Sequence, residues 1–162
     1  MKSEQLLYDS ASQVDYADYV DWCEMNDCEP MGEESSDYYD YVHRVQEWGW
    51  EDLLGNLEYS EANDYEWLIT GWVGTWQGDR DIYPTIEPNL IKAIESCIGR
   101  SMCEFNVVKS GNVVKVRVSH HDGRNYFELT PLTEDGADRF RRNGEVSLRR
   151  KENVRKLPEF LF

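Results

Sequence analysis

His120, His121 and Asp122 form the one dense cluster of residue types that often carry catalysis or bind metal. They lie at the end of a predicted strand, where neighbouring side chains point to opposite faces. The two histidines therefore cannot easily chelate one ion. Asp122 and Gly123 are explained by a predicted turn, so the cluster favours a structural role over chemistry.

The four cysteines do not indicate a metal site either. Cys23 and Cys28 are separated by four residues, and Cys97 and Cys103 by five, which are not the spacings of zinc knuckles. Cys97 and Cys103 fall on apolar faces, which is typical of buried free thiols. Nucleophile elbows and HExxH helices are absent, and no carboxylate pair has an apolar setting. We therefore expect a binding protein rather than an enzyme, with no cofactor and no metal.

Charge is distributed very unevenly along the 162 residues. Residues 1–66 contain 19 acidic residues against Lys2 and Arg44, a formal net charge of −17. Residues 67–162 contain 13 acidic and 15 basic residues, a net charge of +2. Such an asymmetry indicates a charged partner, and solubility is the competing explanation.

The acidic stretch predicts two helices. The first begins with a capping box from Ser12 to Asp15, after an N-terminal segment that is expected to fray. An acidic residue then recurs at every third position as far as Asp27, in a strip that drifts around the helix axis. After a loop, a second helix begins near Ser36, and Gly49 or Gly55 is expected to end it.

These two helices and their loop supply the candidate partner-binding surface. It consists of nine carboxylates with two aromatic side chains: Asp15, Asp18, Asp21, Glu24, Asp27, Glu33, Glu34, Asp37, Asp40, Trp22 and Tyr38. The aromatic residues would add stacking or apolar contact to the charge, as interface cores favour aromatics.

Three strands joined by tight turns are predicted between Cys103 and Pro131. A two-residue turn at Asp122-Gly123 and another at Ser110-Gly111 set the register. On the apolar face these turns pair Val118 with Phe127, Val116 with Leu129, Val107 with Val114, Phe105 with Val116 and Cys103 with Val118. On the other face they pair Arg117 with Glu128 and place Glu104 beside Arg117. The agreement of the faces is informative, because a slip of one residue would reverse every side chain.

The rest of the chain completes an α+β domain. The segments 67–70 and 72–76 are rich in strand formers, and a turn at Gln77-Gly78 or at Gly78-Asp79 leads from them into Ile82 and Tyr83, which gives two strands before the next helix. A helix follows with Pro88 at its first position and Gly99 as its stop, and a short helix fits 133–142 with Thr133 as N-cap. We predict a single domain over 1–162. Its parts are the acidic helices (1–66), an antiparallel sheet in the order ββαβββ (67–131), and a short helix with a basic tail (132–162).

The basic tail has eight basic residues between Arg139 and Lys156, against Glu145 and Glu152. Such a segment can bind nucleic acid, through residues such as Arg139, Arg141, Arg142, Arg149, Arg150 and Lys151. Docking on the acidic N-terminal half is the preferred interpretation, because the net charge of the remainder opposes a polyanion. Leu157–Phe162 is apolar enough to pack on the domain or on an oligomeric partner.

The segments WLITGWVGTWQG (67–78) and VSHHDGRNYFEL (118–129), with the helix between them, resemble small uncharacterised proteins of bacterial phages and mobile elements. Genes in such settings include anti-restriction and anti-CRISPR proteins, many of them acidic. The resemblance covers about the middle third to half of the chain, transfers no functional residues and does not include the acidic helices.

The leading hypothesis is an inhibitor that presents its acidic helices to the basic nucleic-acid channel of a defence enzyme. It would bind that protein in the bacterial cytoplasm, since the sequence has no long apolar run and no signal-peptide pattern. It would not contact nucleic acid directly. The alternative is a protein–protein interaction or immunity-type protein that uses aromatic anchors, Trp48, Trp50, Trp72 and Trp76.

Overall fold

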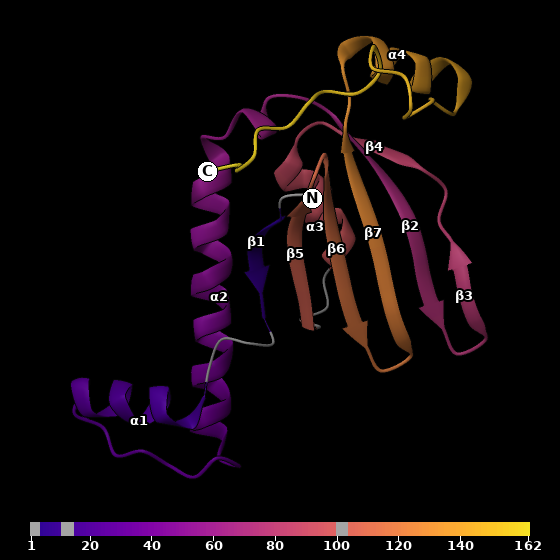
Figure 1. Cartoon of the computed structure of the whole chain (residues 1–162). Helices are drawn as coiled ribbons and strands as arrows, with labels where there is room; N and C mark the ends of the chain where they lie inside the picture. Colours follow the sequence, from indigo (N-terminus) through magenta and orange to yellow (C-terminus); the bar gives the residue numbers. More distant parts are fainter. Residues whose placement is uncertain (1–3, 11–14, 100–103) are drawn as a thin grey trace.

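The computed structural model describes residues 4–10, 15–99 and 104–162. Within these residues the chain has four α-helices and a seven-stranded antiparallel sheet, which confirms the α+β class (Figure 1). The strands lie in the order β1-β5-β6-β7-β2-β3, and β4 pairs with β2 outside this path. The elements are β1 (Glu4–Asp9), α1 (Tyr16–Met25), α2 (Ser36–Glu58), η1 (Glu61–Asn63), β2 (Trp67–Thr75), β3 (Gly78–Asp81), β4 (Thr85–Glu87), α3 (Leu90–Ile98), β5 (Glu104–Ser110), β6 (Val113–His120), β7 (Gly123–Pro131) and α4 (Glu134–Asn143).

The N-terminal segment was expected to fray, and that expectation is wrong. Residues 4–9 form β1, which pairs with β5 at one edge of the sheet. Tyr8 fixes this strand: its ring stacks on Phe105 with centroids 4.7 Å apart, and its hydroxyl donates to the Gln46 carbonyl. These partners lie far away in the sequence, so local pattern gives no sign of them.

The β6–β7 turn was predicted one residue too late. Its central residues are His121 and Asp122, so that Val116 pairs with Phe127 and Val114 with Leu129. A side-chain network favours this turn: Asn125 Oδ1 accepts from Gly74 N at 3.1 Å and lies 2.9 Å from His120 Nε2. The register therefore differs from the prediction by two residues, and the inward face is preserved.

The β5–β6 turn was predicted one residue too early. Its central residues are Gly111 and Asn112, and Val107 pairs with Val116 and Phe105 with Val118. Asn112 is held by the C-terminal segment, because its Nδ2 donates to the Arg155 carbonyl and its Oδ1 accepts from Leu157 N. Cys103, for which a partner was predicted, lies outside the described residues.

The two shifts change the polar pairs but not the core. Glu128 faces Lys115 rather than Arg117, so an opposite-charge pair is kept with a different partner. Glu104 faces Ser119. The predicted inward valines of β5 and β6, with Phe127 and Leu129, are all buried in one core with α3.

Helix α2 does not end at either of its glycines. It runs for 23 residues from N-cap Ser35, one residue before the predicted cap, through Gly49 and Gly55 to Glu58. A Cβ at Gly49 would lie 3.3 Å from the Tyr8 ring, so this glycine allows close packing of α2 on β1. Leu53 and Leu57 bury the C-terminal half of α2 against the sheet core.

Helix α3 covers one face of the sheet, with Leu90, Ala93, Ile94 and Cys97 buried. Its N-cap is Asn89 rather than a residue before Pro88, because the Asn89 side chain accepts from Lys92 N at 2.8 Å. Gly99 ends the helix, as predicted.

Helix α4 matches the prediction closely, with Thr133 as N-cap and Gly144 in the left-handed conformation at its end. The last residues then return to the domain. Leu157 and Leu161 are buried in the main core, and the buried Lys109 donates its Nζ to the Glu159 carbonyl at 2.7 Å. Of the two expectations for 157–162, packing on the domain is confirmed.

Candidate partner-binding surface

The densest group of acidic residues lies on one projecting element, which we call the acidic arm and define as residues 15–41. It contains α1, the loop that follows it and the first turns of α2. In Figure 1, α1 crosses the end of α2 that extends past the sheet, so the arm stands away from the strands. Ten of its residues are Asp or Glu, and none is Lys or Arg.

The arm begins one turn later than predicted. Asp15 is the N-cap of α1, and its side chain accepts from Asp18 N at 2.9 Å. Asp18 completes the capping box, because its carboxylate accepts from Asp15 N. The predicted cap, Ser12, lies outside the described residues. Acidic residues in the first turn also stabilise a helix, because they interact favourably with its macrodipole. Asp15 and Asp18, two of the nine predicted carboxylates, therefore have a structural role as well.

A small aromatic core holds the arm together. Tyr19 and Cys23 are buried, and the Tyr19 ring contacts Tyr16, Tyr38 and Tyr41 at centroid distances of 5.7, 5.3 and 5.3 Å. The Tyr19 hydroxyl also accepts from Met31 N, which fixes the loop. Residues that were predicted as partner contacts are therefore used in part internally: Tyr38 and Trp22 are half-buried against this core.

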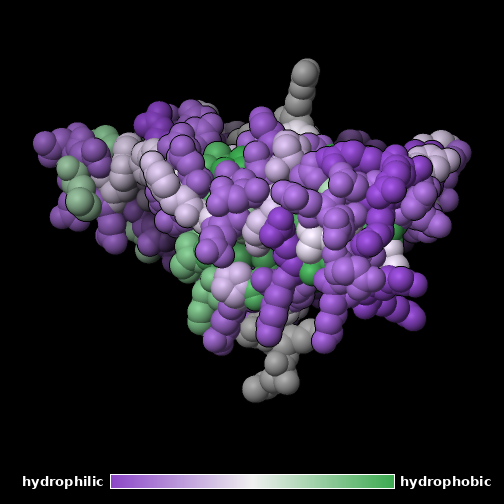
Figure 2. Space-filling view, turned by 90° about the horizontal axis from the view of Figure 1, so that it is seen from above, coloured by the Kyte–Doolittle hydropathy of each residue, from purple (hydrophilic) through white to green (hydrophobic). Residues whose placement is uncertain are grey.

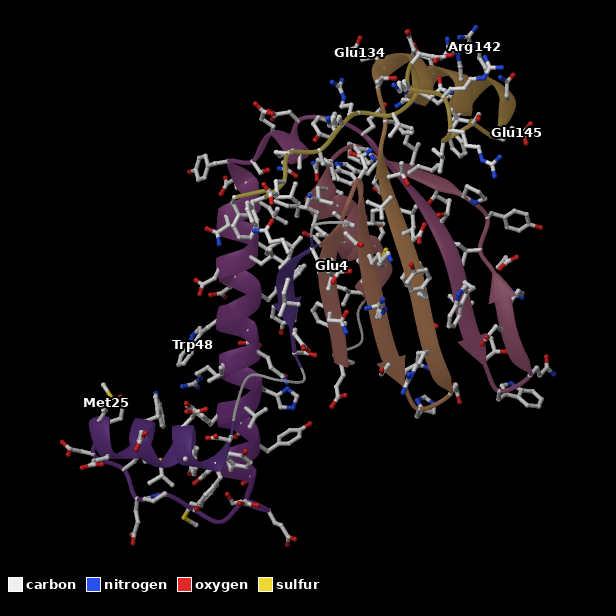
Figure 3. All side chains as sticks on the ribbon, in the orientation of Figure 1. Glu4, Met25, Trp48, Glu134, Arg142 and Glu145 are labelled. Atoms are coloured by element: carbon white, nitrogen blue, oxygen red, sulfur yellow. The ribbon has the colours of Figure 1, made fainter. Side chains whose placement is uncertain are left out.

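All nine predicted carboxylates are exposed to solvent. Within the described part of the chain, none of them lies within 4 Å of a lysine or arginine nitrogen. Figure 3 shows their oxygens pointing outward around α1 and its loop, whereas side-chain nitrogens gather near Arg142 at the opposite end of the molecule. The structure thus brings the predicted acidic residues together on one surface.

The basic C-terminal segment does not cover this surface. Its contacts with residues 1–66 are made at the end of that part: Arg141 pairs with Glu66, and Arg155 lies 4.7 Å from the centre of the Tyr65 ring. The basic segment therefore does contact the acidic half, as predicted, but at Tyr65 and Glu66 and not at the arm. Seen from the α4 end, the surface is mostly hydrophilic, with hydrophobic residues exposed in smaller areas (Figure 2).

Two open hollows shape the arm. One, of about 210 Å³, lies between α1 and α2 and is lined by Tyr19, Trp22, Cys28, Glu29, Asp37, Asp40, Tyr41 and Arg44. A site where aromatic rings lie beside carboxylates can bind a cationic side chain, through cation–π contacts and charge-assisted hydrogen bonds. Glu29 and Tyr41 were not among the predicted site residues. Tyr41 could have been identified from the i, i+3 spacing of Tyr38 and Tyr41, which places the two rings on one side of the helix.

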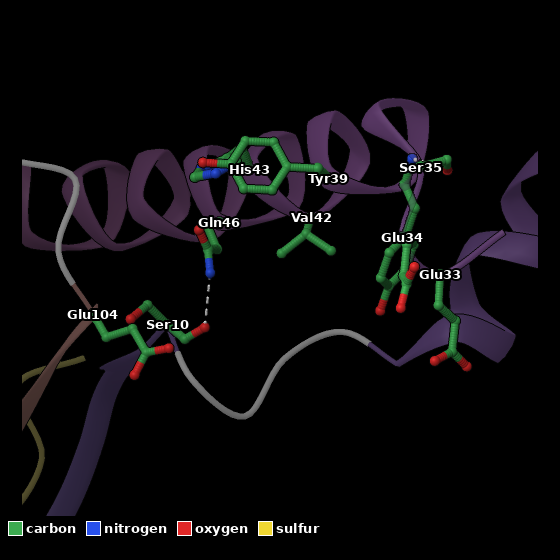
Figure 4. Close-up of a pocket in the computed structure, with 10 residues that line it drawn as sticks. Ser10, Glu33, Glu34, Ser35, Tyr39, Val42, His43, Gln46 and Glu104 are labelled. Carbon is green, nitrogen blue, oxygen red and sulfur yellow. Dashed lines mark hydrogen bonds between the residues drawn. The ribbon is translucent and has the colours of Figure 1, made fainter. Parts of the chain in front are cut away.

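The other hollow, of about 600 Å³, lies between α2 and the end of β1. Figure 4 shows Glu33, Glu34 and Glu104 beside it, with His43 and Tyr39 on α2. The Gln46 side chain donates to the Ser10 carbonyl at 3.0 Å and marks its inner end. It extends the acidic surface from the arm towards the sheet.

The four tryptophans of the alternative hypothesis do not form one patch. Trp48 is 43% exposed on α2, and Trp50 packs edge-on against Tyr8 and Phe105. Trp72 belongs to β2 and Trp76 follows it, and β2 lies near the edge of the sheet opposite to β1 and α2 (Figure 1). Trp76 and Gln77 form the β2–β3 turn, one residue before the first predicted position and two before the second, and Trp76 is 80% exposed.

The sheet face away from α3 carries a separate row of side chains. Trp72, Tyr126 and Arg117 are consecutive neighbours across β2, β7 and β6. The Arg117 guanidinium lies 5.8 Å from the centre of the Tyr126 ring. Burial, followed by the hydrogen bond to Glu128, raises the pKa of Tyr126 to about 12, so its hydroxyl remains a donor at neutral pH.

The histidine cluster forms contacts within its own hairpin. His120 Nδ1 accepts from Asp122 N at 3.2 Å, while His121 lies 3.3 Å from the Asp122 carboxylate and is exposed. In the described ranges there is no group of three or more His, Cys, Asp or Glu side chains that could hold a metal ion. None of the described helices is both long and apolar enough to cross a membrane.

No family model, curated protein or solved structure matches the chain.

Proposed function

We propose that this chain is a binding protein that presents its acidic arm to a basic nucleic-acid-binding protein and occupies the nucleic-acid site by mimicry. A bacterial defence nuclease, of the restriction or CRISPR type, is the partner class we infer. In this proposal the chain originates from a phage or mobile element and acts in the bacterial cytoplasm. It performs no chemistry and does not contact nucleic acid itself.

One observation carries the proposal: ten carboxylates and no basic residue are exposed on a projecting arm whose own core is aromatic. Solubility alone would be served by acidic residues dispersed over the whole surface. Here ten of them share one element without a basic residue, and eight of the chain's 17 lysines and arginines lie between Arg139 and Lys156, at the other end. This separation of charge leaves the arm free to meet a positive surface.

The geometry of the arm supports a nucleic-acid site as its target. Successive acidic residues of α1 rise by about 4.5 Å along the helix axis. Each DNA strand carries one phosphate per about 3.4 Å of its helix axis, so the arm offers a comparable density of negative charge to lysines and arginines that normally bind phosphates. The hollow between α1 and α2 would receive one such side chain between Trp22 and the carboxylates of Asp37 and Asp40.

The proposal is tested by DNA-cleavage assays with a panel of restriction and CRISPR nucleases. The arm variant replaces five exposed carboxylates that take no part in helix capping: Asp21→Asn, Glu24→Gln, Glu33→Gln, Glu34→Gln and Asp40→Asn. A matched control removes the same charge outside the arm: Glu51→Gln, Asp52→Asn, Asp79→Asn, Asp81→Asn and Glu145→Gln.

We expect the natural chain and the control to inhibit a nuclease of the panel and the arm variant to lose that inhibition. Each exposed ion pair contributes about 0.2–1 kcal/mol, so five of them together contribute about 1–5 kcal/mol and change the affinity by about fivefold or more. Equal inhibition by all three proteins would overturn the mimicry proposal.

One specific observation favours a second candidate, a protein–protein interaction through the β2–β3 side of the sheet. Trp76 is 80% exposed at the turn, and Trp72 continues along the open face next to Tyr126. Large exposed aromatic residues are the usual anchors of such interfaces. In that case Trp76→Ala would abolish partner binding, whereas the arm variant would bind normally.

A further inference from the structure

The C-terminal end of α1 has a specific backbone geometry. Cys28 N donates to the Cys23 carbonyl at 3.0 Å, a bond between residues five apart. Between them, Asp27 has φ = 55°, and it is the one non-glycine residue with positive φ in the described ranges. A left-handed residue at a helix end, enclosed by a hydrogen bond between residues five apart (a 6→1 bond), defines a Schellman motif.

This motif places Cys23 and Cys28 at its two contacting positions. The residue after the left-handed one normally packs on the residue five positions earlier, so Cys28 packs on Cys23. Contact between the thiols also explains the titration of Cys28: a hydrogen bond with the Cys23 side chain, followed by burial, raises the pKa of the Cys28 thiol.

The backbone spacing suits a disulfide. Given the covalent distances within each residue, a 3.0 Å bond between Cys28 N and Cys23 O keeps the two Cα atoms within about 7 Å of each other. Disulfides need Cα separations of about 4.4–6.8 Å. Cys28 is exposed and reachable by an oxidant, whereas Cys23 is 1% exposed and lies beneath it.

We propose that Cys23 and Cys28 form an intramolecular disulfide, which makes the end of α1 a redox-sensitive modification site within the acidic arm. The oxidant is a small-molecule disulfide. The Cys28 thiolate attacks it, forms a mixed disulfide and releases one small thiol. The Cys23 thiolate then attacks the Cys28 sulfur and releases the second, so the protein loses two hydrogen atoms and the oxidant gains them.

The crosslink fixes the loop that follows α1. Cys28 lines the hollow between α1 and α2, beside Glu29 and Tyr41. Joining it to the last turn of α1 removes the fraying that a helix end otherwise shows, and it holds Asp27 and Glu29 in place. This inference depends on the thiol geometry alone and does not require the proposed function.

The test uses the full chain with Cys97→Ser and Cys103→Ser, so that only the two cysteines of the motif remain. The folded protein is equilibrated with mixtures of reduced and oxidised glutathione and then studied by intact mass and peptide mapping. We expect the loss of two hydrogen masses, one Cys23–Cys28 crosslinked peptide and an unchanged circular dichroism spectrum. Amide exchange at residues 26–29 should slow by about tenfold in the oxidised form.

A second variant, Cys28→Ser, should show no crosslink and leave the buried Cys23 unmodified. If that variant fails to fold, the chain with both cysteines still decides the question. A stable glutathione adduct on Cys28, a disulfide-linked dimer, or two free thiols in fully oxidised glutathione would each overturn the proposal. Unchanged exchange at residues 26–29 in the crosslinked protein would do so as well.

Discussion

Replacing Tyr19 by alanine is expected to release α1 from α2 while the sheet stays folded. Tyr19 is 2% exposed, and it is the centre of the aromatic core of the arm, in contact with Tyr16, Tyr38 and Tyr41. Truncating a buried aromatic residue to alanine costs about 3–5 kcal/mol. Helix α1 has only 10 residues, and its remaining ring contacts with α2 are those of Tyr16 and Trp22, so we expect a loss of this size to detach it.

The assay is hydrogen exchange followed by mass spectrometry. Amides of α1 should exchange at nearly the rate of an unfolded chain in Tyr19→Ala, whereas those of β5, β6 and β7 should keep their protection. Tyr83→Ala is the control, because Tyr83 is 91% exposed and its loss should change neither region. Leu57→Ala gives the opposite pattern: Leu57 is fully buried in the main core, so the sheet should lose about 2–5 kcal/mol.

Two results would refute this reasoning. Continued protection of α1 in Tyr19→Ala would mean that the aromatic core does not hold the arm. Equal loss of protection in the arm and the sheet would mean that they unfold as one cooperative unit.

Three further outcomes are expected. Gly136→Ala should lower the free energy of unfolding by about 1–3 kcal/mol, because its Cβ would lie 2.2 Å from the Asn153 carbonyl oxygen; an unchanged denaturation midpoint would contradict this. Asp15→Ala should destabilise α1 by about 1 kcal/mol through loss of the capping box, seen as faster exchange confined to the first turn. Burial and Glu87 raise the pKa of Cys97 to about 12, so the thiol stays protonated at pH 8; iodoacetamide should label Cys28 in the native protein and leave Cys97 unlabelled.

The residues of the sheet core could be predicted from the sequence because the alternation of apolar and polar residues decides which side chains face the core. It does not decide which residues pair across strands. Val114, Val116 and Val118 point inward whether the turn is centred on residues 121–122 or 122–123, since the two registers differ by an even number of residues. The turn itself could not be predicted, because the hydrogen bonds of Asn125 with His120 and with Gly74 on β2 outweigh the local preference of Asp-Gly.

The features that were not predicted, strand β1 and the uninterrupted helix α2, depend on contacts between residues far apart in the sequence. Strand β1 depends on Tyr8 packing against Phe105 and Trp50, and the continuity of α2 depends on the absence of a side chain at Gly49, where Tyr8 approaches. Neither contact can be recognised from the composition of the local sequence. Helix α4 was predicted well because its signals, Thr133 and Gly144, are local.

The acidic surface was predicted residue by residue because charged side chains stay in water wherever the chain folds. That Asp21 and Glu34 are exposed follows from their type. That they lie on a projecting arm, away from the basic segment around Arg142, depends on the topology. The sequence also could not show that Tyr38 is used in the internal core of the arm.

The most direct measurement is the dissociation constant of the inhibited nuclease for this chain as a function of salt concentration, with and without competing DNA. If the arm imitates nucleic acid, affinity should fall steeply with salt and DNA should displace the chain. The arm variant should bind weakly and with little dependence on salt. An affinity that is insensitive to salt, or a complex that DNA does not displace, would contradict the proposed function.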